Sequence, residues 1–229
     1  MDIDIVRINC RSIREDSIIY QYRQEALALR YKVFCEEMKV VPSNDSKIID
    51  DEFDYHSSTV IFLARVEGKA VGTLRLIRYS EENGLPLINS IEGLEERLER
   101  AIDFRRRLYG GRSFSEAGRL VLLRDYRKNT VSNRNRLISL TMMSDYISYC
   151  RDYGVTDVIG IANPKLLSFY ERIGLRALFN IRDKMTGIPS PVIHSEVEKI
   201  YTCLRRLKAI IIVKSFIDNI TRYFVRWVR

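Results

Sequence analysis

The chain has 229 residues, of which 46% are hydrophobic and 30% are charged, and its formal net charge is +8. This length supports one sizeable hydrophobic core with a small appendage, and the composition excludes a disordered or fibrous protein. The positive charge favours acidic partners, which include nucleic acid, an anionic membrane face and an acidic carrier protein.

Four cysteines are scattered along the chain, at Cys10, Cys35, Cys150 and Cys203. They form no CxxC pair and no His-rich cluster, so we expect neither a metal site nor a disulfide framework. Reduced thiols are typical of the cytoplasm. The first residues include acids and no apolar segment, so we expect no signal peptide, which also favours a cytoplasmic protein. The longest strictly apolar run near the C-terminus, Ala209 to Val213, is too short to span a bilayer.

The first half of the chain predicts a strand, a helix and an antiparallel hairpin. In chain order we expect an edge strand over Ile3–Ile8, a helix over Asp16–Met38, a loop over Ser43–Asp54, and paired strands over Thr59–Val66 and Ala70–Arg78. The helix is indicated by apolar residues at spacings of three and four. Gly68 marks the tight turn of the hairpin.

The second half alternates helices and strands. We expect helices over Leu94–Leu108, Leu137–Cys150 and from Asn163 to Ile173, and strands through Leu120–Leu123, over Val155–Ile161 and, as the last core strand, over Leu175–Ile181. Pro164 directly after Asn163 is typical of a helix start. The order predicts an α/β fold in which helices flank a mixed, mostly antiparallel central sheet.

Residues 200–229 differ in composition from the preceding part of the chain. Apolar residues from Leu207 to Trp227 recur at spacings of three and four, and basic residues lie between them. We therefore divide the chain into a domain over 1–199 and a basic amphipathic helical extension over 200–229. The apolar stripe either lies peripherally on an anionic membrane, on its inner cytoplasmic face, or packs on protein.

The stretch from Ser113 to Arg136 carries the strongest functional signal. Glu116 and Arg119 lead into the apolar segment Leu120–Leu123, which is followed by a polar, basic turn and then a helix. Such a turn places backbone N–H groups and positive charge against a phosphate. On a regular strand Glu116 and Arg119 would face opposite ways, so we expect a bulge at Gly118.

Several motifs resemble one superfamily. Asn163 to Leu175 (NPKLLSFYERIGL) resembles the late helix of the GCN5-related N-acetyltransferases. The segments LRYKVFCEE, DEFDYHSS, VGTLRLI and EAGR, in this order, are similar to acyl-homoserine-lactone synthases, N-acyl amino acid synthases and exosortase-associated acyltransferases. The resemblance covers roughly residues 29 to 175 and implies an acyltransferase with the superfamily's fold.

The resemblance also implies site residues. Its substrate-binding motifs match Arg30, Phe34, Glu52, Asp54, Arg75 and Arg119. Glu52 and Asp54 match the first two acids of the synthase acidic triplet, whereas the third position holds Ser57. The missing acid disfavours a homoserine lactone as the product.

The basic turn departs from the superfamily pattern. A CoA-dependent acetyltransferase usually has a Gly-rich turn here, whereas the segment Arg127–Ser132 contains no glycine. The residues that we expect to bind phosphopantetheine are Leu122, Arg127, Lys128, Thr130 and Ser132. This turn, with the positive charge, favours an acyl carrier protein as the donor, because carrier proteins are acidic. The acyl-phosphopantetheine thioester, on carrier protein or CoA, is then a substrate, and no cofactor is permanently bound.

Two residues are candidates for catalysis. Glu116 is the candidate base, because burial raises the pKa of a carboxyl group toward neutrality, and Tyr170 is the candidate acid for the leaving thiolate. A backbone N–H near Leu120–Leu122 is expected to stabilise the oxyanion. Glu116 with Arg119 is alternatively a strand-end ion pair, and Tyr170 alternatively packs in the core.

We therefore expect an N-acyltransferase that moves a fatty acyl group from acyl carrier protein, or acyl-CoA, to the amine of an amino acid or similar small molecule. The alternatives are an autoinducer synthase that forms a lactone, a CoA-dependent N-acetyltransferase, and a binding module without catalysis on the same fold. Nucleic acid is the partner that we do not expect, because no reading helix or stacking surface stands out.

Overall fold

One seven-stranded sheet organises the molecule, with the order β1-β2-β3-β4-β5-β7-β6. The computed structural model describes residues 2–11, 13–128, 133–183 and 186–210. The strands are β1 (Ile3–Asn9), β2 (Thr59–Val66), β3 (Lys69–Arg78), β4 (Phe114–Leu122), β5 (Asp157–Ile161), β6 (Arg176–Arg182) and β7 (Pro189–Glu196). Only β4 and β5 pair in parallel, and the other neighbours are antiparallel. The predicted mixed sheet is therefore confirmed.

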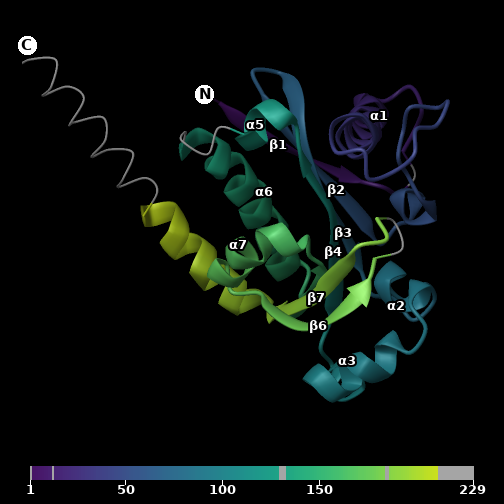
Figure 1. The fold of residues 1–229 in the computed structure, drawn as a ribbon, viewed down its shortest axis with the longest axis vertical. Helices are drawn as coiled ribbons and strands as arrows, with labels where there is room; N and C mark the ends of the chain where they lie inside the picture. Colours follow the sequence, from purple (N-terminus) through teal and green to yellow (C-terminus); the bar gives the residue numbers. More distant parts are fainter. Residues whose placement is uncertain (1, 12, 129–132, 184–185, 211–229) are drawn as a thin grey trace, which may run out of the picture.

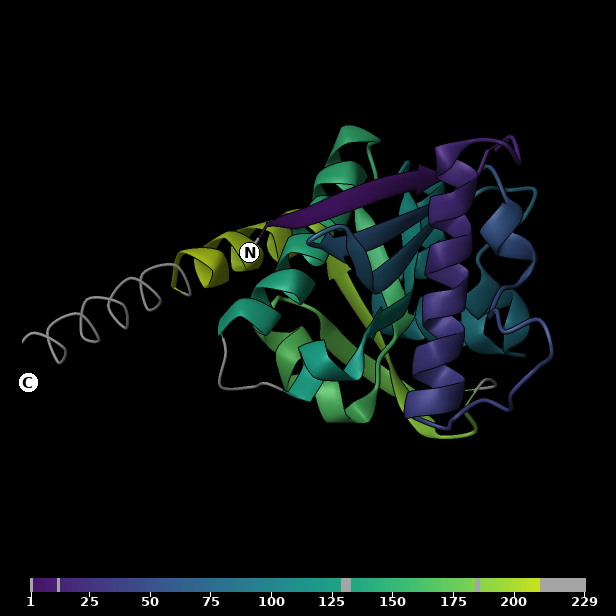
Figure 2. The same cartoon turned by 90° about the horizontal axis from the view of Figure 1, so that it is seen from above.

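Helices cover both faces of the sheet (Figures 1 and 2). They are α1 (Ile18–Tyr31), a π-helix (Lys32–Glu37), a 3₁₀-helix (Glu52–Tyr55), α2 (Pro86–Ser90), α3 (Leu94–Ile102), α4 (Phe104–Tyr109), α5 (Arg124–Lys128), α6 (Asn133–Asp152), a 3₁₀-helix (Pro164–Leu166) and α7 (Leu167–Arg172). A further helix begins at residue 197 and is described to residue 210. Figure 2 shows α1 on one face, and α6, α7 and the last helix on the other.

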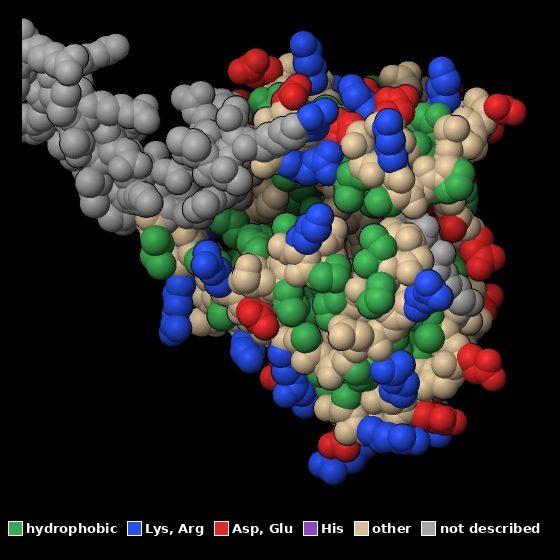
Figure 3. Space-filling view, viewed as in Figure 1, with side chains coloured by type: hydrophobic (Ala, Val, Ile, Leu, Met, Phe, Trp, Pro, Cys, Tyr) green, Lys and Arg blue, Asp and Glu red, His purple; other side chains and the backbone are tan. Residues whose placement is uncertain are grey.

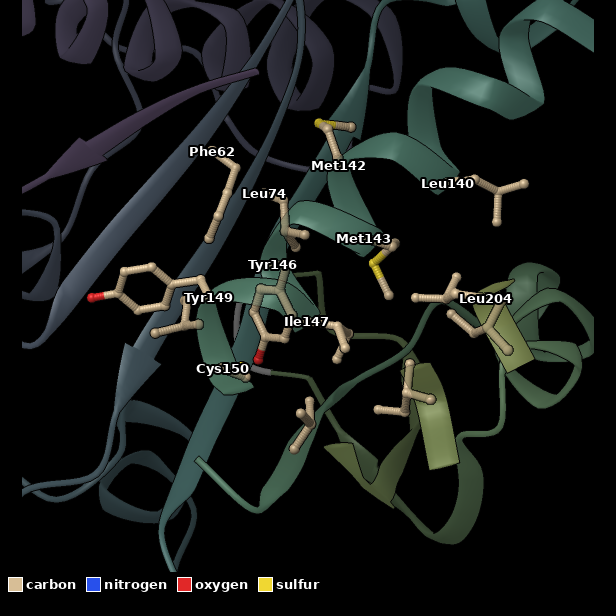
Figure 4. Packing of buried hydrophobic residues seen from close by; sticks show 14 of the residues in the cluster. Phe62, Leu74, Leu140, Met142, Met143, Tyr146, Ile147, Tyr149, Cys150 and Leu204 are labelled. Carbon is tan, nitrogen blue, oxygen red and sulfur yellow. The ribbon is translucent and has the colours of Figure 1, made fainter. Parts of the chain in front are cut away.

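The largest hydrophobic core lies between the sheet and α6 (Figure 4). Phe62 of β2 meets Tyr146 and Tyr149 of α6 with ring centroids 5.8 and 6.0 Å apart. Ile200 and Leu204 of the last helix are buried in the same cluster. The first turns of the predicted extension therefore pack on the core. Residues 211–229, which carry most of its apolar stripe, lie outside the described residues.

Three elements differ from the sequence-based expectations. The predicted helix over Asp16–Met38 ends as an α-helix at Tyr31 and continues as the π-helix. The helix expected over Leu94–Leu108 is divided into α3 and α4, because Asp103 adopts a left-handed conformation (φ 53°). β6 is not the last core strand, because β7 follows it and lies between β5 and β6.

Proline explains why β7 is hard to recognise in the sequence. Pro189 and Pro191 have no N–H for a sheet ladder, so their segment reads as a break. In the structure both pair only with β6, and pairing with β5 begins at Val192. On the β5 side only the Pro191 carbonyl is used, accepting from the N–H of Ala162 at 2.9 Å, so neither proline has to supply an N–H to that neighbour.

Candidate active site

A buried ion pair anchors α1 to the loop before β2. The Arg30 side chain is fully buried, and its Nη1 donates to Asp54 Oδ1 at 2.8 Å. Asp54 belongs to a short 3₁₀-helix with a capping box: Asp51 accepts from the N–H of Phe53, and Asp54 accepts from the N–H of Asp51, both at 3.1 Å. The acidic loop is thus a structured element in which the carboxylates of Asp51 and Asp54 point inward.

Two further arginines extend this pair into a network. Arg75 Nη1 lies 2.6 Å from Asp51 Oδ1 and 3.1 Å from Asp54 Oδ2, and Arg119 Nη2 lies 2.9 Å from Asp51 Oδ2. Burial opposes ionisation of Asp51, but Arg75 and Arg119 outweigh it and lower its pKa to about 2. Burial likewise opposes the charge of Arg75, yet Asp54 and Asp51 raise its pKa overall. The pair of Arg75 and Asp51 therefore remains charged at neutral pH.

A bulge in β4 turns Arg119 toward this network. Thr73 of β3 lies opposite Val121, and Arg75 lies opposite Gly118. The single residue between them in β3, Leu74, therefore lies opposite two residues of β4, Arg119 and Leu120. Arg119 adopts φ 55°, a left-handed conformation that is unusual for a side chain other than glycine. The bulge expected near Gly118 is confirmed, and it brings Arg119 to the face of the sheet that carries Glu116.

Glu116 is the titratable group of this site. Its Oε2 accepts a 2.7 Å hydrogen bond from the backbone N–H of Leu87 at the start of α2. Burial raises its pKa to about 7, and the Leu87 N–H, Arg75 and Arg119 oppose that rise. The residue as a whole is half-buried. A carboxyl group that titrates near neutrality is suited to proton transfer.

β4 and β5 part directly beyond Glu116. Their pairing covers Phe114–Ala117 of β4, whereas β4 continues to Leu122. Gly160 marks the last close approach, since a Cβ there would lie 2.5 Å from the Ala117 carbonyl oxygen. Beyond this point the strand edge of β4 faces the space between the two strands.

The edge of β4 presents Leu122 to this space. Leu123 N–H bonds to Val71 of β3, and N–H directions alternate along a strand, so the Leu122 N–H points toward the β5 side. Half-buried apolar side chains of three elements near the gap pack against the main core. They are Leu120 of β4, Tyr126 of α5, and Leu167 and Phe169 of α7. Figure 3 shows apolar side chains gathered over the middle of this face, with Lys and Arg largely around them.

Tyr170 and Phe34 lie apart from the ionic network. Tyr170 is buried in the core on the α6 face, 5.6 Å from the Phe169 ring between centroids, and burial raises its pKa to about 12. Its hydroxyl therefore carries a proton at neutral pH. Phe34 is buried in a separate cluster with Val121, where the π-helix packs on the end of β4. The catalytic role of Tyr170 and the substrate-binding role of Phe34 stay predictions.

The structure changes the assignment within the acidic loop. Glu52 is exposed, and the carboxylate that joins Arg75 to Arg119 is that of Asp51. Sequence reasoning missed Asp51 although it lies in the same DDEFD run, because the motif does not fix which acids of a loop point inward. It also missed Leu87, whose contribution is a backbone N–H that leaves no side-chain signal.

The predicted phosphopantetheine turn is described only in part. The Arg127 guanidinium is hydrogen-bonded to Glu37 of the π-helix. Lys128 ends α5, and its side chain lies outside the described residues, as do Thr130 and Ser132. Their predicted contact with the donor stays a prediction.

The family model of the N-acyl amino acid synthase FeeM matches residues 25–189. The chain belongs to this family. It is therefore an acyltransferase, as the motifs predicted. The matched segment contains Arg30, the acidic loop, Arg75 and β4 with its bulge. None of the curated proteins searched matches the sequence.

Solved structures support the same fold. FeeM, an N-acyl amino acid synthase from uncultured soil microbes, has a TM-score of 0.61 and 15% identity, with 86% of this chain and 93% of that chain covered. BjaI, a CoA-dependent acyl-homoserine lactone synthase with SAM and isopentyl-CoA, has a TM-score of 0.59 and 16% identity, with 90% of each chain covered. Escherichia coli ElaA has a TM-score of 0.55 and 16% identity, with 85% of this chain and 100% of that chain covered. These resemblances confirm the fold expected for the superfamily.

Other kinds of site are not found within the described part of the chain. Residues 2–11, 13–128, 133–183 and 186–210 contain no cluster of three or more potential metal ligands. Among the helices described there, none has both the length and the apolar character to cross a membrane. A surface cavity of about 410 Å³ is lined by Ile88–Glu96 and Arg105, and none of the arginines and aspartates of the network is among its lining residues. We assign the candidate site to the network, because it places a carboxyl group that titrates near neutrality beside the parted strands.

Proposed function

We propose that the chain transfers a fatty acyl group from the phosphopantetheine thioester of acyl carrier protein to the α-amine of an amino acid. The observation that carries this proposal is Glu116, a carboxyl group with a pKa of about 7 between the arginine network and the parted strands. A base with this pKa is about half ionised at neutral pH and is matched to removing a proton from an amine.

The acceptor carboxylate is proposed to bind Arg119. Of the three arginines, Arg30 and Arg75 have 0% and 4% of their side chains exposed, whereas Arg119 has 19%. Three guanidinium groups face the carboxylates of Asp51, Asp54 and Glu116, and Arg119 is the most exposed of the three. A guanidinium fits the carboxylate of an acceptor through two hydrogen bonds.

The reaction assigns a task to each group. Glu116 takes a proton from the acceptor ammonium group, and the amine nitrogen then attacks the thioester carbonyl carbon. Negative charge develops on the carbonyl oxygen, where the Leu122 N–H is the proposed hydrogen-bond donor. The C–S bond breaks, and Tyr170 is the proposed donor of the proton that converts the leaving thiolate into a thiol. The second proton of the nitrogen passes to the Tyr170 oxygen, and Glu116 releases the first proton to solvent, so that an amide and a free thiol are the products.

The approach of the two substrates follows from the sheet. Glu116 and Arg119 lie on the α1 face, whereas Tyr170 and the apolar border of the gap lie on the α6 face. We propose that acceptor and donor enter from opposite faces and meet between β4 and β5. The lactone-forming alternative is disfavoured because Ser57, an exposed serine, holds the position of the third acid.

Location and membrane contact form a further part of the proposal. We place the reaction in the cytoplasm, with the part of the extension 200–229 that follows its core-packed first turns contacting the anionic inner face of the membrane. The support is compositional, since basic and apolar residues alternate at helical spacing. Sedimentation of the full chain with anionic and with neutral vesicles tests this: binding to neither type contradicts the membrane contact.

The test of acyl transfer uses the purified full chain, acyl carrier proteins loaded with acyl groups of several lengths, and a mixture of amino acids. Mass spectrometry should detect an N-acyl amino acid and free carrier thiol. Glu116→Gln, which retains an acceptor for the Leu87 N–H, should lower the rate by about 10²- to 10⁴-fold. The matched control is Glu82→Gln, which changes an exposed glutamate. Undiminished transfer by Glu116→Gln would remove Glu116 from the mechanism.

A further inference from the structure

Glu37 fastens the end of the π-helix to the turn that follows β4. Its Oε1 accepts a 3.2 Å hydrogen bond from the backbone N–H of Arg124, and its Oε2 accepts from Nη2 of Arg127. Only 14% of the Glu37 side chain is exposed, against 32% for Arg127. A carboxylate of the protein thus occupies both a backbone donor and a guanidinium at the start of α5.

The carboxylate is held in place by its surroundings. Phe34 and Cys35 of the same π-helix are buried against Val121 of β4, and Met38 and Leu123 pack at the edge of this cluster. The backbone N–H of Met38 bonds to the Val33 carbonyl at 2.9 Å, which closes the π-helix. The backbone that carries Glu37 is therefore held by packing, which limits the positions that its carboxylate can reach.

The position of Glu37 has an electrostatic consequence for the donor. The turn beyond β4 lies at the end of the gap where the phosphopantetheine arm of the proposed reaction would leave the protein. Free CoA carries a pyrophosphate and a further phosphate, whereas the arm of a carrier protein carries a single phosphodiester. Like charges a few ångströms apart repel strongly where the effective dielectric is low. A fixed carboxylate here disfavours CoA more than it disfavours the carrier arm.

We propose that Glu37 is a donor-specificity residue that selects against acyl-CoA through its carboxylate and its pairing with Arg127. This inference rests on the proposed acyl transfer. It assigns Glu37 no part in the chemical step, so donors without phosphate should be used equally well whether or not its charge is present. The exposed neighbour Glu36 differs by one position and supplies a control for charge alone.

The test compares three donors with the same acyl chain: acyl-pantetheine, which has no phosphate, acyl-CoA and acyl carrier protein. The measured quantity is kcat/KM for each, with the acceptor held constant. In Glu37→Gln the ratio of acyl-CoA to acyl-pantetheine should rise about tenfold, from the removal of one repulsive charge. Glu36→Gln should leave the ratio unchanged. Glu37→Asp keeps the charge with a shorter reach, and it should keep the discrimination.

The outcomes separate this inference from the proposed function. If none of the three donors is used by the natural chain, the proposed function fails. If they are used and Glu37→Gln leaves the ratio unchanged, Glu37 has no effect on donor choice and the specificity role is refuted. A lowered ratio also refutes it, since Glu37 would then help Arg127 to bind phosphate. Calorimetric binding of CoA itself gives a readout independent of turnover: Glu37→Gln should bind about tenfold more tightly. Equal binding by both proteins would contradict the inference.

Discussion

Glu116 should make the protein less stable as its carboxyl group ionises. Its pKa in the folded state is about 7, against an ordinary value of 4.5. Between these values the folded state binds the proton more strongly than the unfolded state. The contribution of Glu116 to the free energy of unfolding is therefore greatest below 4.5 and is lost as the pH rises to about 7.

The size of this loss follows from the shift. A difference of about 2.5 pKa units corresponds to about 3 kcal/mol as an upper limit, and about 2.5 kcal/mol of it falls between about pH 5 and about pH 8. Glu116→Gln keeps the shape of the side chain and does not ionise. Relative to the natural chain, this variant should gain up to that amount of stability on going from the lower pH to the higher.

Urea unfolding followed by circular dichroism at both pH values measures the difference between the two proteins. Taking the difference cancels the titration of groups that they share, including Asp51. Glu82→Gln is the control, because its exposed carboxylate should give no pH-dependent difference. If Glu116→Gln differs from the natural chain by the same amount at both pH values, the carboxyl group does not titrate in this range, and the argument for a base near neutrality fails with it.

Three further results are expected. The value of kcat/KM for acyl transfer should rise with pH through about 7, since the base must be ionised. Arg119→Gln should move this inflection to higher pH, because the Arg119 charge lowers the pKa of Glu116; an unmoved inflection would mean that another group titrates. Asp54→Ala should lower the free energy of unfolding, measured with urea, by about 3–5 kcal/mol, because it leaves buried Arg30 without its partner. The control Glu52→Ala changes an exposed position and should alter this free energy by less than about 0.5 kcal/mol.

Sequence patterns with a regular period predicted most of the fold. The strand pair from Thr59 to Arg78 and the helix after the basic turn follow directly from apolar spacing and turn residues. The division at Asp103 was not predictable, because a left-handed aspartate leaves the helical spacing on both sides intact. The sequence did not predict β7, because prolines are typical of a break between elements. Whether a missing proline N–H weakens a strand depends on which strands pair with it, and this is known only from the sheet.

The candidate site was predictable where a residue lies on a regular element. Arg30 on α1 and Arg75 on β3 face inward as their positions require. The choice of Asp51 over Glu52 depended on the capping box of a single 3₁₀ turn, which fixes side-chain directions that no periodicity encodes. A loop acid can be recognised as part of a site from its motif, but which carboxylate reaches the arginines is decided by local backbone geometry.

The backbone conformation of Arg119 at the bulge lowers the stability of the strand but places its guanidinium at the site. A left-handed backbone disfavours an arginine relative to glycine by about 1–2 kcal/mol. Glycine already stands one position earlier, at Gly118, so a glycine at 119 would be the more stable solution for the strand alone. The arginine gains its 2.9 Å contact with Asp51 and brings positive charge beside Glu116. Local strain retained at a residue beside a titrating carboxyl group supports the proposal that Arg119 binds the acceptor, since such strain is found most often at functional sites.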